Sequence, residues 1–323
     1  MTESRIPKTA LEAVAGLDLA GRVYLVTGAY SGLGAMTSRA LLSGGATVIV
    51  AGRNARAQAD FASELVKEGF DAERIDADRT LDLGNLAAVR DFAADIAARY
   101  ETIDCLVNNA GVMNTPPGKT ADGFEVQMGT NVIGHFLLAK LLSPRTKRQV
   151  WLSSAGHTLT GDPPGDVHHL DRAPRINLDI IRQVDEADYD SWHRYQQSKL
   201  GDILLAKQFF IEFDHLETCA VHPGVVRTNL SRHMSKWTMV KYVWAAITGK
   251  GASMLTPEQG ARTQTLCAVM PSEALSNGAY YADCVVTDEA DSAKNMEDAK
   301  RLYDFCDEVT RPFQDLAAAR GAA

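Results

Sequence analysis

Short apolar runs alternate with longer amphipathic stretches along most of this chain. The apolar runs are "RVYLVT" (22–27), "TVIVA" (47–51), "IDCLVN" (103–108), "RQVWLS" (148–153) and "TCAVH" (218–222), with a weaker strand possible before "LDL" (81–83). The stretches with helical periodicity are 33–45, 55–69, 85–99, 123–142 and one around residue 195. Strands separated by helices at this spacing form right-handed crossovers, so the pattern predicts a parallel sheet covered by helices on both faces.

The length of 323 residues is compatible with one large domain or two small ones. The chain is 46% hydrophobic and 23% charged, which is typical of a globular protein with a large core. No repeat and no low-complexity linker divides it, and the segments 161–174 and 228–256 are better explained as insertions. We therefore expect a single domain over 1–323, with a core at about 20–285 and an amphipathic helical tail at about 287–323.

Charge and cysteine content exclude several classes of protein. The net charge of −8 disfavours nucleic-acid binding, which needs a basic surface. The five cysteines are scattered and include no Cys-x-x-Cys pair, so neither a disulfide framework nor a metal site is predicted. We find no signal peptide and no apolar run of roughly 18 residues that could span a bilayer. These features predict a cytoplasmic protein without a transmembrane segment.

A glycine cluster follows the first apolar run directly. The sequence "TGAYSGLG" places Gly28, Gly32 and Gly34 where the predicted strand gives way to a helix. Glycines at such a junction let the backbone approach a pyrophosphate and direct a helix N-terminus towards it. The alternative is a tight turn that uses glycine for its positive φ angles. Three glycines that open a strand–helix–strand unit favour the nucleotide site.

The stretch "RYQQSKLGDILLA" (194–206) places Tyr195 and Lys199 four residues apart, and hence on the same face of a helix. An ammonium group close to a phenol favours the phenolate, which makes proton transfer at neutral pH easier. Such pairs also arise by chance on many helices, so this pair is informative only in combination with other motifs.

Further motifs follow in order along the chain: "NNAG" (108–111), "LSS" (152–154), "YQQSK" (195–199) and "HPG" (222–224). With the glycine loop, they make residues 20–285 resemble the short-chain dehydrogenase/reductase family. The runs "DGFE", "TNVIGHFLL" and "YDSWHRYQQSKLGDILLA" are most similar to its retinol-dehydrogenase-like and WW-domain-oxidoreductase-like branch, without the membrane anchor or WW domains of some members. The resemblance implies a single-domain α/β fold of the Rossmann type: a doubly wound parallel sheet of about seven strands.

The resemblance also implies a role for each of four residues. Tyr195 is the expected general acid/base, and Lys199 favours its phenolate form and binds the nicotinamide ribose. Ser154 is expected to hydrogen-bond the substrate carbonyl oxygen, with Ser153 as the alternative serine. Asn131 is expected to hold the water molecule of a proton relay.

The end of the second strand, "VIVAGRN", predicts the cofactor. Gly52 stands where an acidic residue would bind the ribose 2′-hydroxyl of NAD, and Arg53, which follows, suits a 2′-phosphate. We therefore expect NADP(H) in preference to NAD(H). Arg56 and Arg39 are second candidates for binding the phosphate. The alternative for Arg53 is that it is a solvated loop arginine without a role in binding. By the resemblance, the residues expected at the cofactor are Gly28, Tyr30, Ser31, Gly32, Leu33, Gly34, Arg53, Asp82, Leu83, Asn109, Ala110, Gly111, Tyr195, Lys199, Pro223, Gly224 and Thr228.

Two variable regions are expected near the substrate. The insertion at about 158–190 separates Ser154 from Tyr195, and the substrate loop at about 226–256 is rich in apolar residues between Trp237 and Trp244. These residues favour a sizeable hydrophobic substrate; packing on the core and contact with a membrane surface are the alternatives. His157, His168 and His169 are expected to be surface loop residues.

Together these features predict an NADP(H)-dependent oxidoreductase (EC 1.1.1.-), a carbonyl reductase that interconverts a ketone or aldehyde and an alcohol. A nucleotide-sensing protein without turnover and an epimerase or dehydratase of the extended branch are the alternatives. The resemblance further suggests a homodimer or homotetramer built through the helices at 123–142 and 190–213.

Overall fold

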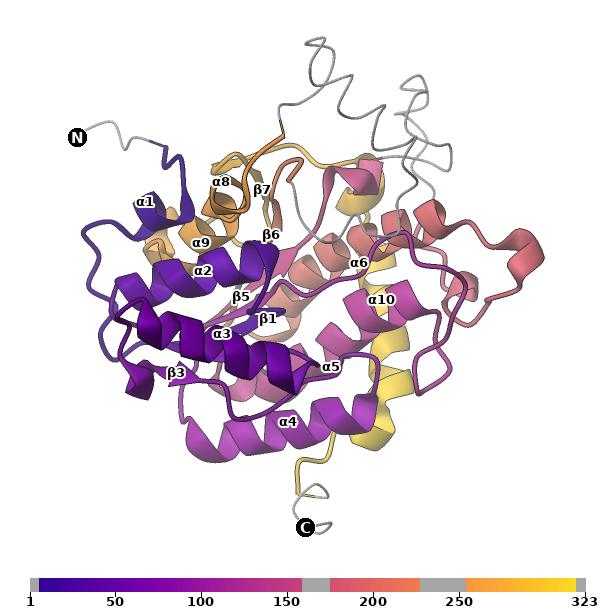
Figure 1. The fold of residues 1–323 in the computed structure, drawn as a ribbon. Helices are drawn as coiled ribbons and strands as arrows, with labels where there is room; N and C mark the ends of the chain where they lie inside the picture. The colour runs from indigo at the N-terminus through magenta and orange to yellow at the C-terminus, as the bar shows by residue number, and fades with distance from the viewer. Residues whose placement is uncertain (1–5, 159–174, 227–253, 318–323) are drawn as a thin grey trace.

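The structure, a computed structural model, describes residues 6–158, 175–226 and 254–317. Its centre is one sheet with the strand order β3-β2-β1-β4-β5-β6-β7-β8 (Figure 1). The strands are β1 Val23–Thr27, β2 Thr47–Ala51, β3 Ile75–Asp76, β4 Cys105–Asn108, β5 Arg148–Leu152, β6 Glu217–His222, β7 Tyr280–Ala282 and β8 Val285–Val286. The strands β1 to β7 run parallel to their neighbours, and β8 alone pairs antiparallel.

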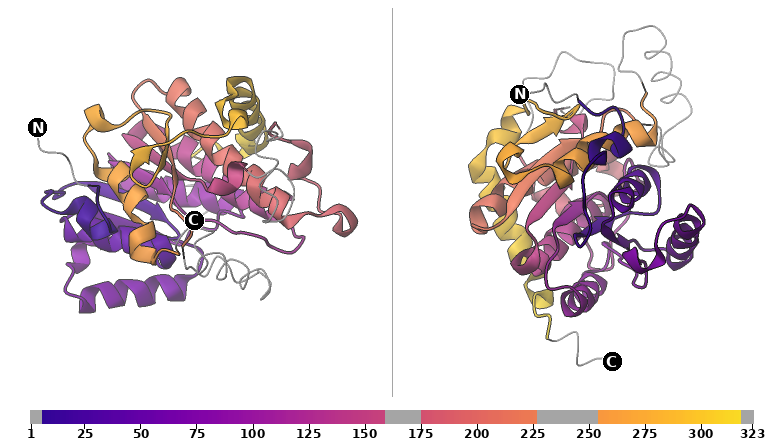
Figure 2. Two further views of the ribbon diagram at one scale, coloured as in Figure 1. Left: turned by 90° about the horizontal axis from the view of Figure 1, so that it is seen from above. Right: turned by 90° about the vertical axis from the view of Figure 1, so that its left-hand side faces the viewer.

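Helices cover both faces of this sheet, as Figure 2 shows in two further views. The α-helices are α1 Ala10–Val14, α2 Gly32–Ser43, α3 Ala55–Lys67, α4 Leu86–Arg99, α5 His135–Leu142, α6 Ser191–Glu212, α8 Pro257–Gly260, α9 Arg262–Val269 and α10 Met296–Thr310. A π-helix, η2, spans Met128–Gly134 and leads directly into α5. The prediction of a doubly wound parallel α/β sheet with helices on both faces is therefore confirmed.

The described part of the sheet has eight strands, one more than the seven or so that were predicted. Asp283 and Cys284 have φ angles of 49° and 68°. Two successive residues with positive φ form the tight turn typical of a hairpin, and here they bring Val286 opposite Tyr281. The added strand is only two residues long, too short to show an alternating pattern in the sequence.

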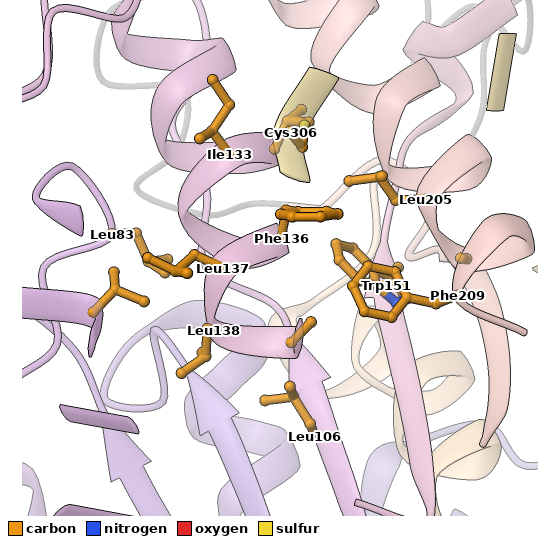
Figure 3. Packing of buried hydrophobic residues seen from close by; sticks show 14 of the residues in the cluster. Leu83, Leu106, Ile133, Phe136, Leu137, Leu138, Trp151, Leu205, Phe209 and Cys306 are labelled. Atoms are coloured by element: carbon orange, nitrogen blue, oxygen red, sulfur yellow. The ribbon is translucent and has the colours of Figure 1, made fainter. Parts of the chain in front are cut away.

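Two separate apolar clusters hold the layers together. One lies between the sheet and α4, α5, α6 and α10, and the other between the sheet and α1, α2, α3 and α9. In the first cluster the rings of Phe136, Trp151 and Phe209 pack together (Figure 3). The centroid of the Phe209 ring lies 5.5 Å from that of Phe136 and 5.4 Å from that of Trp151. These contacts fix α5 and α6 against β5.

One predicted helix begins later than expected. The sequence predicted a helix over 123–142, but an isolated bridge pairs Glu125 with Lys119, and the π-helix starts at Met128. The Glu125 carboxylate accepts hydrogen bonds from the backbone N–H groups of Gln127 (3.0 Å) and Met128 (2.8 Å). This acidic side chain therefore marks the beginning of the helix, because it satisfies N–H groups that have no partner within it.

The strand order locates the place where a ligand can bind. The chain winds outwards from β1 in both directions, towards β2 on one side and towards β4 on the other. In open α/β sheets a crevice forms at such a switch point, beyond the carboxyl ends of the strands. Residues 28–34 and 109–111 follow β1 and β4 at this edge.

Candidate functional site

The glycine loop brings backbone N–H groups to this edge. Gly28 and Gly32 have φ angles of 63° and 53°, a conformation that glycine adopts without strain. A β-carbon on Gly34 would lie 2.4 Å from the carbonyl oxygen of Gly28, so only glycine fits where α2 meets the strand end. Ser31 precedes α2, but its side chain makes no cap hydrogen bond. The N-terminus of α2 therefore keeps N–H groups for an anion.

Thr27 fixes the second loop, 109–111, next to the glycines. Its hydroxyl oxygen accepts hydrogen bonds from the N–H groups of Asn109 (2.9 Å) and Ala110 (2.8 Å). The same hydroxyl lies 2.9 Å from Nε2 of His135, whose Nδ1 lies 2.9 Å from the carbonyl oxygen of Asn131. Because that carbonyl can only accept, Nδ1 carries the proton and Nε2 accepts from Thr27. Burial lowers the pKa of His135 to about 3, so the ring is neutral.

Asn131 joins this loop to the helix that carries Tyr195. Its Oδ1 accepts from the N–H of Val112 (2.9 Å), and its Nδ2 donates to the carbonyl of Val112 (3.0 Å) and to the hydroxyl of Ser198 (3.0 Å). The Ser198 hydroxyl donates in turn to the carbonyl of Tyr195 (2.7 Å). A β-carbon on Gly111 would lie 3.4 Å from Oδ1 of Asn131 and 3.7 Å from Nζ of Lys199. The loop 109–111 thus lies next to both Asn131 and Lys199, two of the predicted site residues.

Tyr195 and Lys199 lie on α6, one turn apart. Asp190 caps the N-terminus of the helix: its carboxylate accepts from the N–H groups of Trp192 (2.9 Å) and His193 (3.0 Å). Nζ of Lys199 lies 5.8 Å from the centre of the Tyr195 ring, and the Trp192 ring stands nearly perpendicular to that ring at 6.2 Å. Both side chains are buried.

The Lys199 ammonium has two further partners inside the protein. It donates to the carbonyl of Leu152 at the end of β5 (2.8 Å) and to Oδ2 of Asp202 (2.9 Å). Burial alone would lower the pKa of Lys199, but the attraction of the Asp202 carboxylate, together with the interaction with Tyr195, raises that pKa above its usual value. Burial raises the pKa of Asp202 to about 6, although Lys199 acts in the opposite direction.

The two serines of "LSS" have different surroundings. The Ser153 hydroxyl is buried and donates to the carbonyl of Lys199 (2.7 Å). The Ser154 side chain is half-buried and accepts a hydrogen bond from the N–H of Gly156 (3.1 Å). A β-carbon on Gly156 would lie 3.3 Å from Cε1 of Tyr195 and 3.4 Å from Oγ of Ser154. The Ser154 hydroxyl and the Tyr195 ring therefore both lie next to Gly156, whereas the Ser153 hydroxyl is hydrogen-bonded to the backbone.

His157 is not a surface residue, so that prediction was wrong. Its Nδ1 donates to the carbonyl of Ser154 (2.6 Å) and its Nε2 accepts from the N–H of Ala290 (3.2 Å). Its ring lies 4.9 Å from the ring of Tyr280 and is buried, which lowers its pKa. A turn of 3-10 helix over Ala155–Thr158 carries the ring inwards. His168 and His169 lie outside the described residues.

Position 52 admits no side chain in this arrangement. A β-carbon on Gly52 would lie 2.1 Å from Cε1 of Tyr30, whose ring packs over the end of β2. The next residue, Arg53, is exposed. Of the two other candidate arginines, Arg39 is bound to the carboxylates of Glu64 and Glu68, whereas Arg56 is 92% exposed.

The remaining predicted cofactor residues surround the same edge, except for one that the structure does not describe. Asp82 is exposed, and its carboxylate accepts from the N–H of Gly84 (3.0 Å); the Leu83 side chain is buried in the core. Pro223 and Gly224 are half-buried after β6. Thr228 and most of the substrate loop lie outside the described residues, as does the first half of the insertion.

Sequence reasoning missed four polar residues of this site: His135, His157, Ser198 and Asp202. Three of them have a signal in the sequence, because His135, Ser198 and Asp202 lie one helical turn or less from a predicted residue. His157 is also only three residues from Ser154, but no helix was predicted there, and its burial depends on a contact with Ala290, which is 133 residues away.

The chain is similar in sequence to known proteins. A family model for short chain dehydrogenases matches residues 22–151. The chain is 33% identical to human retinol dehydrogenase 12 over 300 residues, which cover 91% of this chain and 87% of that protein. It is also 33% identical over 311 residues to the chloroplastic short-chain dehydrogenase TIC 32 A of Brassica napus, with 92% of this chain and 91% of that protein covered.

A solved structure is similar over nearly the whole chain. This is the crystal structure of an uncharacterised protein from Mycobacterium paratuberculosis, with 30% sequence identity and a TM-score of 0.70. The match covers 93% of this chain and 97% of the other.

Proposed function

The chain belongs to the short-chain dehydrogenase/reductase family, in its retinol-dehydrogenase-like branch, and we propose that it is an NADP(H)-dependent enzyme for a sizeable hydrophobic carbonyl or alcohol, with Tyr195 as its acid/base. Its membership makes it an oxidoreductase of carbonyl and alcohol groups that uses a nicotinamide cofactor. The observation that carries the proposal is the convergence of Asn131, Ser154, Tyr195 and Lys199, with Gly111 and Gly156 between them.

The residues at the switch point fit a dinucleotide. The positive φ angles of Gly28 and Gly32 and the close contact of Gly34 with the strand end leave no room for side chains where a pyrophosphate would approach. The N-terminus of α2 supplies N–H groups for its charge. Asn109 to Gly111 lie next to this loop and would hold the adenine-side ribose, while Lys199 would bind the nicotinamide ribose.

The proposed chemistry divides between cofactor and protein. A bound nicotinamide would supply the hydride for reduction or accept it in oxidation. In reduction, Tyr195 gives its phenolic proton to the substrate oxygen, which becomes the alcohol; in oxidation it takes that proton back. The Ser154 hydroxyl hydrogen-bonds the same oxygen. Lys199 stabilises the phenolate between turnovers, and Asn131 orients the water that returns a proton to it.

The preference for NADP(H) is supported by the end of β2. Because the Tyr30 ring fills the space beside Gly52, no carboxylate can extend from this position towards a ribose. Arg53, exposed at the next position, offers a guanidinium for a 2′-phosphate.

A hydrophobic substrate is supported by three observations. The Trp192 ring stands against Tyr195, the loop at 226–256 is rich in apolar and aromatic residues, and a relative is named for retinol, an apolar alcohol. A panel of hydrophobic aldehydes, ketones and alcohols of increasing size, followed by NADPH absorbance, tests this part. We expect kcat/KM to rise with apolar size.

Location and assembly belong to the same proposal. All five cysteines are buried and free, as expected of a protein in a reducing compartment such as the cytoplasm. In the described part of the chain, no helix is long and apolar enough to cross a membrane. We propose a homodimer or homotetramer, which light scattering on the purified protein would test.

Replacing Tyr195 by phenylalanine tests the assignment of the acid/base. Tyr195→Phe keeps the ring but removes the proton, so we expect kcat/KM to fall by roughly 10²–10⁴ on every accepted substrate. Tyr303→Phe is the matched control, because Tyr303 is a buried tyrosine that packs between Phe136 and Phe209. Turnover by Tyr195→Phe at the rate of the control would refute the assignment.

A further inference from the structure

Asp202 places a negative charge against Lys199 inside the protein. Lys199 is 4% exposed and Asp202 is 3% exposed, and the distance from Nζ to Oδ2 is 2.9 Å. The two residues are three positions apart on α6, so the helix itself fixes their separation. The described ion pairs of this chain include many at the surface, whereas this one lies next to Tyr195.

Stability alone gives a weak reason for such a pair. Removing two charges from water carries a desolvation cost that their attraction often fails to recover, and apolar residues of similar volume are frequently at least as stabilising. The neighbouring positions of α6 are apolar and buried: Leu200 is 2% exposed, and Ile203, Leu204 and Leu205 are fully buried. A charge at this position therefore calls for an explanation beyond packing.

We propose that Asp202 is a positioning residue for Lys199, which anchors the ammonium and sets how much of its positive charge acts on Tyr195. This inference rests on the proposed roles of Tyr195 and Lys199. An ammonium has three N–H donors. The carbonyl of Leu152 and the carboxylate of Asp202 take two of them, so the third is directed by two fixed contacts and remains for a cofactor hydroxyl.

The carboxylate also controls the charge at the site. It keeps the buried lysine protonated against desolvation, which raises the pKa of Lys199. It also offsets part of the ammonium charge that the phenol experiences. Among the described residues, the ionisable groups that act on this arrangement from other elements include His135 of α5, which is neutral, and Tyr280 of β7, which interacts with Tyr195. From β5, the contribution is the Leu152 carbonyl.

Asp202→Asn removes the negative charge but keeps the hydrogen bond, because the amide oxygen can still accept from Lys199. Without the carboxylate, Tyr195 experiences the full ammonium charge and Lys199 loses its proton more easily. We therefore expect both limbs of the pH profile of kcat/KM to move to lower pH, by about one unit or more, a size typical of buried charges. Asp202→Ala removes the contact as well, so it should raise the KM for the cofactor more than Asp202→Asn does.

The matched control is Glu217→Gln. Glu217 pairs with the buried Arg148 at the opposite ends of β6 and β5 from the site, with 2.6 Å between Nη2 and Oε2. Its loss should lower the thermal stability but leave the pH profile in place. If Asp202→Asn likewise lowers only the stability, or moves the profile to higher pH, the inference is wrong.

A readout without turnover keeps this test separate from the proposed function. The tyrosinate absorbance of the full-length protein, minus that of the Tyr195→Phe variant, reports the ionisation of Tyr195 alone. We expect Asp202→Asn to shift the midpoint of this titration to lower pH, and an unchanged midpoint would refute the inference. A shifted midpoint in a protein that turns over no substrate would support the role of Asp202 and reject the proposed function.

Discussion

At the scale of single residues, the end of β2 decides which side chain can reach the proposed cofactor site. The Tyr30 ring occupies the space beside Gly52, so the neighbouring Arg53 is the side chain available there. A guanidinium binds a phosphate through two parallel hydrogen bonds, and hydrogen bonds to charged groups contribute about 1.5–3 kcal/mol each. The choice between the two nicotinamide cofactors should therefore depend on one contact.

Arg53→Gln should lower kcat/KM for NADPH by roughly 10-fold or more, because the amide cannot replace the charged contact. The value for NADH should change little, since that cofactor has no 2′-phosphate. Initial rates with both cofactors give the ratio directly. Arg56→Gln is the matched control, as Arg56 is an exposed arginine three residues along. A larger effect at Arg56 than at Arg53 would reassign the phosphate contact.

At the scale of elements, His135 joins three parts of the chain. It contacts Thr27 at the end of β1, which holds the loop after β4, and Asn131 in the π-helix. A neutral ring is required, because Nε2 must be unprotonated to accept a hydrogen bond from the Thr27 hydroxyl. The position of the loop after β4 and that of Asn131 therefore depend on the same uncharged imidazole.

This dependence predicts a loss of stability in acid. The pKa of His135 is lowered from 6.5 to about 3 in the folded protein by burial. Between these values the unfolded chain binds a proton that the folded protein does not, so the stability present above pH 6.5 is lost as the pH falls towards 3. His135→Gln should remove this contribution, about 1.4 kcal/mol per pH unit. Urea unfolding at pH 5 and at pH 7.5 measures the free energy of unfolding at each pH. An equal change in this free energy between the two pH values for wild type and variant would contradict the prediction.

The elements themselves were largely predictable from the sequence. The run 47–51 matches β2 residue for residue, because a buried parallel strand is a continuous apolar run bounded by turns. Contacts between distant segments were not predictable: the bond from the Ala290 N–H to His157 depends on where the chain after β8 returns. The charge of Asp202 was visible, but its burial against Lys199 depends on the packing of α6.

At the scale of the whole molecule, the candidate site lies where the sheet changes direction. β1 and β4 are neighbours at the centre of the sheet, and the two apolar clusters fix the helices on either face. The loops after these strands and the helix α6 therefore converge on a rigid framework. Such a framework can hold a proton donor and a nucleotide within reach of one substrate carbon.

Transfer of hydrogen from cofactor to product tests this account most directly. NADPH that carries deuterium at the transferable position of the nicotinamide ring is incubated with the wild-type protein and an accepted hydrophobic aldehyde. We predict an alcohol that is one mass unit heavier, with its deuterium on the former carbonyl carbon, and almost none from Tyr195→Phe. An alcohol without deuterium, or labelled alcohol formed as fast by Tyr195→Phe as by the wild type, would contradict the account.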